Sequence, residues 1–169
     1  MTDPEFSIRR AAEADLPRVA QLAAKLVRQH HAFDARRFFL QEPVERGYEW
    51  WFRQELPRDG ALILVATRGD RGERGERGER IVGYTYATVE ERDWNLLLDA
   101  HAGLHDIYVD DDQRGGGVGG ALLEATFREL TALGAPRIVL MSASQNVVAQ
   151  KLFAKHGFRP TMVEMTREL

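Results

Sequence analysis

The spacing of apolar and polar residues divides the first third of the chain into a strand and two helices. Phe6 to Arg10 alternates apolar and polar positions, which is typical of a short strand. Between Leu16 and Val27 the apolar residues form one helix face, and Asp15, or Glu13 just before it, is positioned to cap that helix. Pro43 opens a second helical stretch that ends near Leu56.

Shorter apolar runs, separated by turn residues, indicate that strands and helices alternate in the rest of the chain. The order β-α-α-β-β-β-α-β-α-β predicts a mixed α/β sheet, antiparallel in its first half and with a parallel crossover in the middle. The later strands are expected at 61–67, 81–89, 104–109, 137–143 and 161–166, and the later helices at 121–133 and 147–155.

A low-complexity segment interrupts this pattern. Residues 69–80 repeat the triplet Gly-Glu-Arg and contain no apolar residue to bury. Such a segment adds nothing to a core, and lengthening a loop costs little closure entropy. We expect a solvated hairpin-loop insertion within a single domain that spans residues 1–169.

The composition excludes several classes of function. The net charge of −3 provides no basic field for nucleic acid, and the absence of cysteine excludes disulfides, thiolate metal sites and a cysteine nucleophile. No apolar run approaches the ~20 residues that span a membrane, and no signal-peptide pattern opens the chain. We expect a cytoplasmic protein with no metal site and no membrane partner.

The most informative segment is a glycine loop between the strand at 104–109 and the helix that follows. Glycine lacks the Cβ atom that would keep a ligand from the backbone, and a helix N-terminus presents free N–H groups at the positive end of its dipole. These features favour a bound pyrophosphate. The loop runs from Arg114 through Gly115, Gly116, Gly117, Val118, Gly119 and Gly120.

The same glycines match the dinucleotide fingerprint of oxidoreductases, but their context argues against that function. The fingerprint follows the first strand of its fold, with an acidic residue about 20 positions later. Here several elements precede the loop, and position 140 is leucine. The Lys-Ser/Thr end of a P-loop is also absent.

Two blocks of sequence resemble the GNAT acetyltransferases. Arg114 to Gly119 resembles their Arg/Gln-x-x-Gly-x-Gly/Ala signature, and Asn146 to Phe158 resembles the next block at the family's spacing. Leu104 to Val109 resembles the family's fourth strand. The resemblance implies an α/β fold whose mostly antiparallel central sheet is flanked by helices and splayed between strands four and five.

The resemblance also implies acetyl-CoA as the cosubstrate and an amine as the acceptor. The backbone amides of Gly115 to Gly120, beside Arg114, would hold the pyrophosphate. The pantetheine arm would pair with the main chain of Ile107, Tyr108 and Val109, and the Val109 N–H would donate to the oxyanion. Asn146 would bond the pantetheine as well as cap its helix, and that helix, with Ala149 and Phe153, would flank the thiol.

His105 is the expected general base. It stands where many relatives keep a carboxylate, and the ordinary pKa of imidazole suits a base at neutral pH. On a regular strand His105 shares a face with Ile107 and Val109, although a β-bulge would re-aim it. Asp106 and Glu91 are the alternatives.

The general acid is less clear, because Phe153 stands where many relatives have tyrosine. Three explanations are open: the thiolate leaves unaided, another hydroxyl donates the proton, or catalysis is lost. The last would make the protein a catalytically weak acyl-CoA-binding or sensing module. The candidate hydroxyls belong to Tyr108, Ser142 and Ser144.

The acceptor is expected to be a primary amine of a small molecule or peptide. In the family, the region around His30 and His31 often walls the acceptor site, and a solvated loop is the alternative. Trp50, Trp51 and Phe52 either line an acceptor pocket or belong to the core. The sequence leaves a homodimer open.

Overall fold

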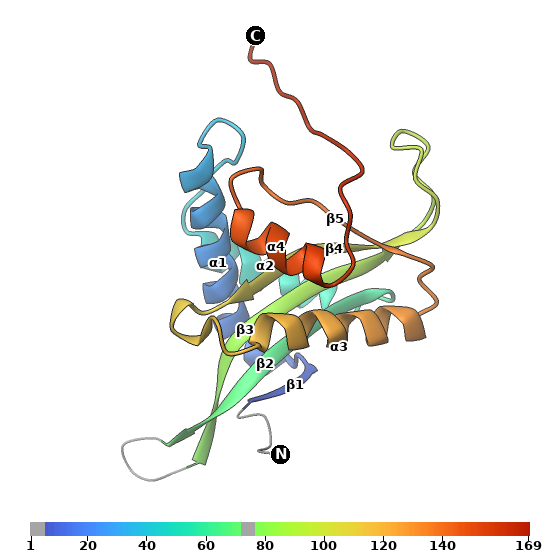
Figure 1. The fold of residues 1–169 in the computed structure, drawn as a ribbon. Coiled ribbons are helices and arrows are strands. Elements are labelled where there is room, and N and C mark those ends of the chain that lie inside the picture. The colour runs from blue at the N-terminus through green and yellow to red at the C-terminus, as the bar shows by residue number, and fades with distance from the viewer. Residues whose placement is uncertain (1–5, 72–76) are drawn as a thin grey trace.

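The protein is built on one five-stranded sheet with the strand order β1-β2-β3-β4-β5, seen in a computed structural model that describes residues 6–71 and 77–169 (Figure 1). Neighbouring strands are antiparallel except β4 and β5, which are parallel. This is not the doubly wound parallel sheet that the dinucleotide fingerprint requires. The strands are β1 (Phe6–Arg10), β2 (Ala61–Arg71), β3 (Arg77–Glu90), β4 (His101–Val109) and β5 (Ile138–Leu140).

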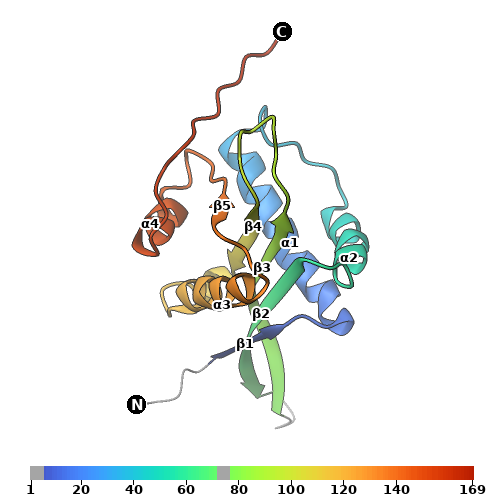
Figure 2. The same ribbon diagram turned by 90° about the vertical axis from the view of Figure 1, so that its right-hand side faces the viewer.

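Two helices cover each face of the sheet, which confirms the expected mixed α/β architecture (Figure 2). α1 (Leu16–Phe33) and α2 (Val44–Glu55) lie on one face, and α3 (Val118–Ala132) and α4 (Val147–Lys155) lie on the other. Short 3₁₀ turns, η1 (Glu13–Asp15) and η2 (Asp111–Gln113), precede α1 and the glycine loop. None of the helices in the described ranges is both long and apolar enough to cross a membrane.

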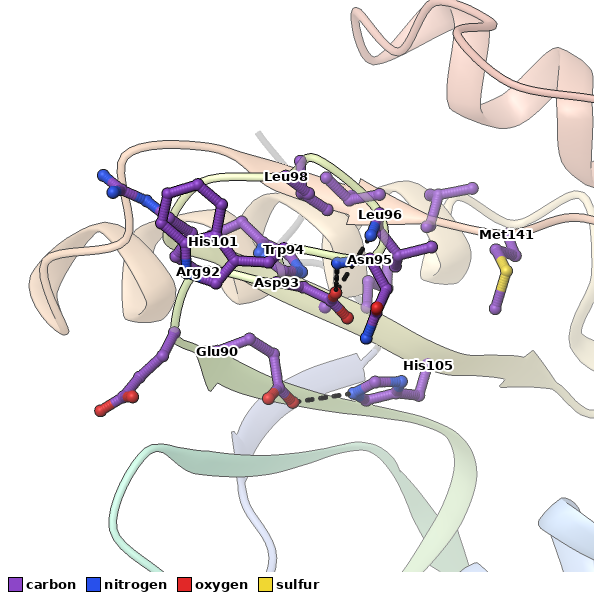
Figure 3. A pocket seen from close by; sticks show the side chains of 15 residues that line it. Glu90, Arg92, Asp93, Trp94, Asn95, Leu96, Leu98, His101, His105 and Met141 are labelled. Atoms are coloured by element: carbon purple, nitrogen blue, oxygen red, sulfur yellow. Dashed lines mark hydrogen bonds and ion pairs between the residues drawn. The ribbon is translucent and has the colours of Figure 1, made fainter.

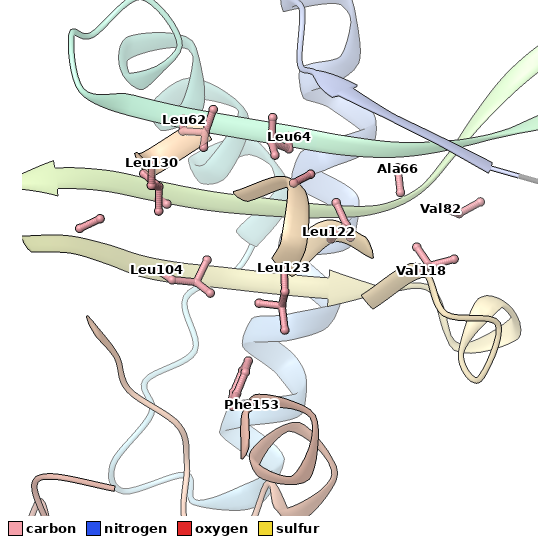
Figure 4. Close-up of a cluster of buried hydrophobic side chains, with 13 residues drawn as sticks. Leu62, Leu64, Ala66, Val82, Leu104, Val118, Leu122, Leu123, Leu130 and Phe153 are labelled. Carbon is pink, nitrogen blue, oxygen red and sulfur yellow. The ribbon is translucent and has the colours of Figure 1, made fainter. Parts of the chain in front are cut away.

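Strand alternation gives each face its own core. Leu62 and Leu64 of β2 point toward α3, where they pack in a cluster with Leu122 and Leu123 (Figure 4). The intervening Ile63 instead joins a second cluster, with residues of α1 and α2, on the opposite face. The sheet is therefore buried on both sides, which explains its long apolar strands.

Several elements extend beyond their predicted ends. β2 and β3 continue as paired strands to Arg71 and Arg77, so residues 69–71 and 77–80 of the expected loop are strand, and 72–76 lie outside the described residues. Backbone hydrogen bonds can extend a hairpin without apolar side chains. The pattern of apolar residues therefore does not predict where these two strands end. β4 begins three residues earlier than expected, and α3 begins at Val118, inside the glycine loop.

The predicted strand at 161–166 is wrong. Residues 158–169 have no regular secondary structure, and the chain runs away from the sheet in both views (Figures 1 and 2). Met162 and Met165 are 81% and 90% exposed. The segment contains apolar residues, but none of the described strands pairs with it, and a strand without a partner leaves its backbone groups to water.

The sheet splits beyond Leu104, as the sequence resemblance implied. β5 pairs with β4 only from Ala102 to Leu104, opposite Ile138 to Leu140. The rest of β4, from His105 to Val109, pairs with β3 alone. One edge of this segment is therefore free of a partner strand.

Candidate active site

A β-bulge places His105 at the point where the sheet splits. Tyr86 of β3 is paired with Asp106, but the next residue, Ala87, is paired with Leu104. His105 is therefore an extra residue in β4 with no partner of its own. The sequence raised a bulge only as a general possibility for this strand.

The bulge reverses which side chains share a face. Asp106 and Tyr108 lie on the α1–α2 side, whereas Ile107 and Val109 pack toward α3. His105 lies on the α1–α2 side too, against Tyr86 at a ring-centroid distance of 5.2 Å. The expectation that His105 shares a face with Ile107 and Val109 is therefore wrong, because the extra residue breaks the period of two.

The bulge also turns the backbone donors of the following residues. The Asp110 N–H donates to Val82 O of β3 at 2.8 Å. Successive N–H groups alternate in direction along a strand, so the N–H groups of Ile107 and Val109 point away from β3, toward the free edge. Before the bulge the even-numbered residues donate in the other direction. The Ala102 N–H points toward β5 and donates to Arg137 O, whereas the Asp110 N–H points toward β3.

The glycine loop connects this strand to α3 through two left-handed residues. Gly115 and Gly117 have φ of 81° and 84°, conformations that favour glycine. Gly117 caps α3, so the first N–H groups of that helix have no partner within it. Arg114 donates from Nε to Val109 O at 3.1 Å, and its guanidinium stacks on Tyr108. The loop is exposed, which leaves these donors open to an anion.

Two later glycines have a different role. A Cβ at Gly119 would lie 3.3 Å from Leu152 Cδ2, and one at Gly120 would lie 3.2 Å from His156 Nε2. Both contacts are with α4 or the residue that ends it. Gly119 and Gly120 therefore allow α4 to approach α3, and a side chain at Gly119 would disturb that packing instead of entering a phosphate site.

Two cavities meet at His105. A wide cavity of about 700 Å³ lies beneath the connection 90–98 and reaches β4 and β5 (Figure 3). A narrow cavity of about 50 Å³ lies in the split between β4 and β5, closed by α1 and α4. The residues that line both are Leu104, His105, Leu140 and Met141.

The narrow cavity gathers several of the predicted residues. Asn146, Ala149 and Phe153 line it from α4, and Ile107 lines it from β4. The Asn146 side chain accepts from the Ala149 N–H at 3.3 Å, as expected for a cap. Phe153 is only 7% exposed and also belongs to the core beside α3.

The sequence did not single out His30 for this cavity. His30 and His31 lie in the last turn of α1, not in a solvated loop, and His30 lines the narrow cavity. The Leu26 carbonyl lies 2.9 Å from His30 Nδ1 and so accepts its hydrogen. This leaves Nε2 as the ring atom without a backbone partner.

The surroundings of His105 come mainly from β3. Thr88 Oγ1 lies 2.6 Å from His105 Nε2, and Glu90 Oε1 lies 3.8 Å from the same nitrogen. Burial lowers the pKa of His105 below 6.5, and the nearby Glu90 carboxylate opposes that shift. His105 is therefore neutral at neutral pH and able to accept a proton.

Asp106, the first alternative base, is held by a tyrosine. The Tyr84 hydroxyl donates to Asp106 Oδ2 at 3.0 Å. Burial raises the pKa of Asp106 to about 6, and the bond from Tyr84 opposes this rise only in part. Asp106 also lines the narrow cavity, whereas Glu91 lines the wide one.

The other aromatic and hydroxyl candidates lie elsewhere. Phe52 is fully buried and Trp51 packs on it, while Trp50 is 65% exposed, and none of the three lines either cavity. The Tyr108 hydroxyl donates to Asp111 Oδ1 at 3.3 Å and Ser144 bonds Gln145. Of the three candidate hydroxyls, only that of Ser142 belongs to a residue lining the narrow cavity.

A buried carboxylate fixes the end of β4. Asp110 is 3% exposed and forms ion pairs with Arg18 and Lys25 of α1, each at 2.5 Å, and with Arg80 of β3 at 3.1 Å. Burial alone would raise its pKa, but these cations outweigh burial and lower the pKa of Asp110. The ionised carboxylate therefore joins α1, β3 and β4 immediately before the glycine loop.

The chain belongs to the acetyltransferase (GNAT) family, because the sequence model of that family matches residues 24–158. No curated protein sequence matches the chain significantly.

Solved structures share the fold across almost the whole chain. A tetramutant of the BH1408 protein from Bacillus halodurans is 23% identical, with a TM-score of 0.75 over 96% of this chain and 99% of that one. The aminoglycoside N-acetyltransferase AAC(6')-Iy, solved with CoA, is 18% identical, with a TM-score of 0.74 over 97% and 94%. The aminoglycoside acetyltransferase meta-AAC0020 from an uncultured soil metagenomic sample, solved with sisomicin, is 22% identical, with a TM-score of 0.65 over 100% and 99%. At these identities the likeness extends to the fold and not to the substrate.

Asp106→Asn should stabilise the protein at neutral pH more than at acidic pH. The pKa of about 6 in the folded state lies above the ordinary 3.8, so the stability from the protonated carboxyl is full below pH 3.8 and is lost as pH rises through 6. Asparagine keeps an acceptor for Tyr84 and removes that loss, which is at most about 3 kcal/mol. Thermal unfolding between pH 5 and 8 measures the difference. If the difference in unfolding temperature between the wild type and Asp106→Asn stays constant across this range, the burial of an ionisable Asp106 is contradicted.

Proposed function

We propose that the protein transfers an acetyl group from acetyl-CoA to a primary amine, with His105 as the general base. The observation that carries this proposal is the position of His105, which lines both cavities beside the free edge of β4. A base for acyl transfer has to reach the attacking amine and stand close to the acyl donor. His105 is the one of the three candidate bases that lines both spaces.

The chain's residues fit acetyl-CoA, which supplies the acetyl group as a thioester. The exposed loop from Gly115 to Gly117 and the unpaired N–H groups at the start of α3 suit its pyrophosphate. The outward N–H groups of Ile107 and Val109 suit its pantetheine arm, which would add to the sheet where β5 has departed. Asn146 and Ala149 then flank the thiol end across the narrow cavity.

His105 removes the proton from the acceptor amine as it attacks the thioester carbon. The Val109 N–H, already aimed at the free edge, donates to the oxygen that becomes negative. Phe153 has no proton to give to the departing sulfur, so the thiolate leaves unaided or takes a proton from the hydroxyl of Ser142, a residue that lines the same cavity.

The wide cavity is the acceptor site. Glu90, Glu91 and Asp93 line it, and its one arginine, Arg92, is paired with Asp99 at 2.9 Å. Negative charge at the entrance favours a cationic amine. Two of the structures that share the fold are named as aminoglycoside acetyltransferases, which makes polyaminated small molecules the first acceptors to test, followed by peptide amines.

Gly116→Val should abolish CoA binding while the protein remains folded. A Cβ at Gly116 meets nothing closer than Gln113 O at 3.7 Å, and its φ is not left-handed, so the backbone tolerates valine. The branched side chain would then stand among the phosphate donors. Calorimetric titration with CoA measures the loss, with Gly47→Val as the matched control because Gly47 has no neighbour within 4 Å and lies on α2. Wild-type affinity in folded Gly116→Val would place the pyrophosphate elsewhere.

His105→Ala should lower turnover by about 10²–10⁴-fold without changing CoA affinity. The acidic limb of the pH–rate profile, which lies below pH 6.5 because burial lowers the pKa of His105, should disappear. Thiol release from acetyl-CoA over a panel of amines measures turnover. His31→Gln is the control, since His31 lines neither cavity.

Near wild-type turnover in His105→Ala would transfer the role of base to Asp106 or Glu91. Tight CoA binding with no thiol release from any amine would instead favour the acyl-CoA-binding module.

A further inference from the structure

Two residues of β3, Thr88 and Glu90, lie against the Nε2 side of the His105 imidazole. We propose that Thr88 and Glu90 are positioning residues, which keep a hydrogen on Nε2 of His105 and leave Nδ1 as the atom that accepts the proton from the acceptor amine. The proposal rests on the proposed function of His105 as the base. It concerns a hydrogen-bond chain that runs from Glu90 through Thr88 to His105.

The direction of this chain follows from the donors that each group has. Thr88 is 1% exposed, and its hydroxyl carries one hydrogen and lies against both Glu90 Oε1 and His105 Nε2. A carboxylate oxygen only accepts, so the hydroxyl hydrogen goes to Glu90. The hydroxyl oxygen is then an acceptor toward Nε2 at 2.6 Å, and Nε2 must carry the hydrogen.

The ring of His105 lies over Gly103 and beside Tyr86. A Cβ at Gly103 would lie 2.9 Å from His105 Cε1 and 3.0 Å from Nε2, so the imidazole occupies the space of a side chain at position 103. The Tyr86 ring lies 5.2 Å away on a neighbouring strand. Figure 3 shows the Glu90 carboxylate facing one side of the ring. With Nε2 bound to Thr88 on that side, Nδ1 is the nitrogen left for the substrate.

The charged groups around His105 are consistent with a hydrogen on Nε2 and proton transfer to Nδ1. When Nδ1 takes the proton, the imidazolium keeps its Nε2–H on Thr88, and the Glu90 carboxylate stands 3.8 Å from that nitrogen. Glu55 at the end of α2 also favours the imidazolium, while Arg58 and His101 oppose it. Glu90 is the nearest opposite charge and the only one of these groups joined to the ring through a hydroxyl.

The ¹⁵N resonances of the His105 imidazole test the tautomer without any turnover. Above the pKa of the ring, the wild-type protein should show a protonated Nε2 and an unprotonated Nδ1. Thr88→Val keeps the shape but removes the acceptor, so the two nitrogen shifts should converge, and Thr88→Ser should restore them. Thr85→Val is the matched control, because Thr85 is also buried on β3 but bonds Thr126 on the α3 face.

Activity gives a second readout. Thr88→Val should lower kcat by about 10- to 100-fold, the range for a lost hydrogen bond to a charged group, and Thr88→Ser should recover most of it. Glu90→Gln should move the acidic limb to lower pH, because the imidazolium loses its nearest carboxylate.

A wild-type hydrogen on Nδ1, or unchanged shifts in Thr88→Val, would overturn the proposal. The proposed function fails separately: turnover that survives His105→Ala would refute the base, whatever the spectra show.

Discussion

One extra residue in β4 sets the geometry on which the site depends. Side chains and backbone N–H groups alternate in direction every residue along a strand. The extra residue at His105 therefore reverses the direction of both in the residues that follow it. Side chains after the bulge that would have faced α3, as Leu104 does, now face α1 and α2, namely those of Asp106 and Tyr108, which join His105 on that face. Backbone donors reverse as well, so the N–H groups of Ile107 and Val109 point to the free edge and not to β3. The base and the backbone donors are thereby brought to the same split in the sheet.

The split persists because the elements on either side of it are held apart by their own packing. α4 packs tightly on α3, where Leu152 occupies the space that a side chain at Gly119 would need. On the other side, Asp110 ties the end of β4 to β3 and α1 through three cations. β5 therefore leaves β4 after Leu104, and the narrow cavity remains between them. The glycines of the loop have two roles. Gly115 and Gly117 adopt the left-handed conformations of the turn, and Gly119 and Gly120 leave space for α4 to pack against α3.

The sequence predicted the order of the elements up to α4, the glycine loop and the family, because these depend on local spacing and on residue types that recur in motifs. It did not predict the bulge, since an extra residue is defined only by the register of a partner strand. For the same reason Thr88 and Glu90 went unnoticed, and His105 was placed on the wrong face. At 161–166 the sequence predicted a strand that does not form. Met162 and Val163 are apolar residues typical of a strand, but local residue types do not determine whether a partner strand is available.

Amide hydrogen exchange along β4, followed residue by residue by NMR, tests this account most directly. The bulge predicts that the N–H groups of Ile107 and Val109 exchange rapidly in the free protein and slowly with CoA bound. The Tyr108 N–H, which faces β3, should be protected in both states. Protection of Val109 equal to that of Tyr108 in the free protein, or no change at Ile107 and Val109 when CoA binds, would contradict it.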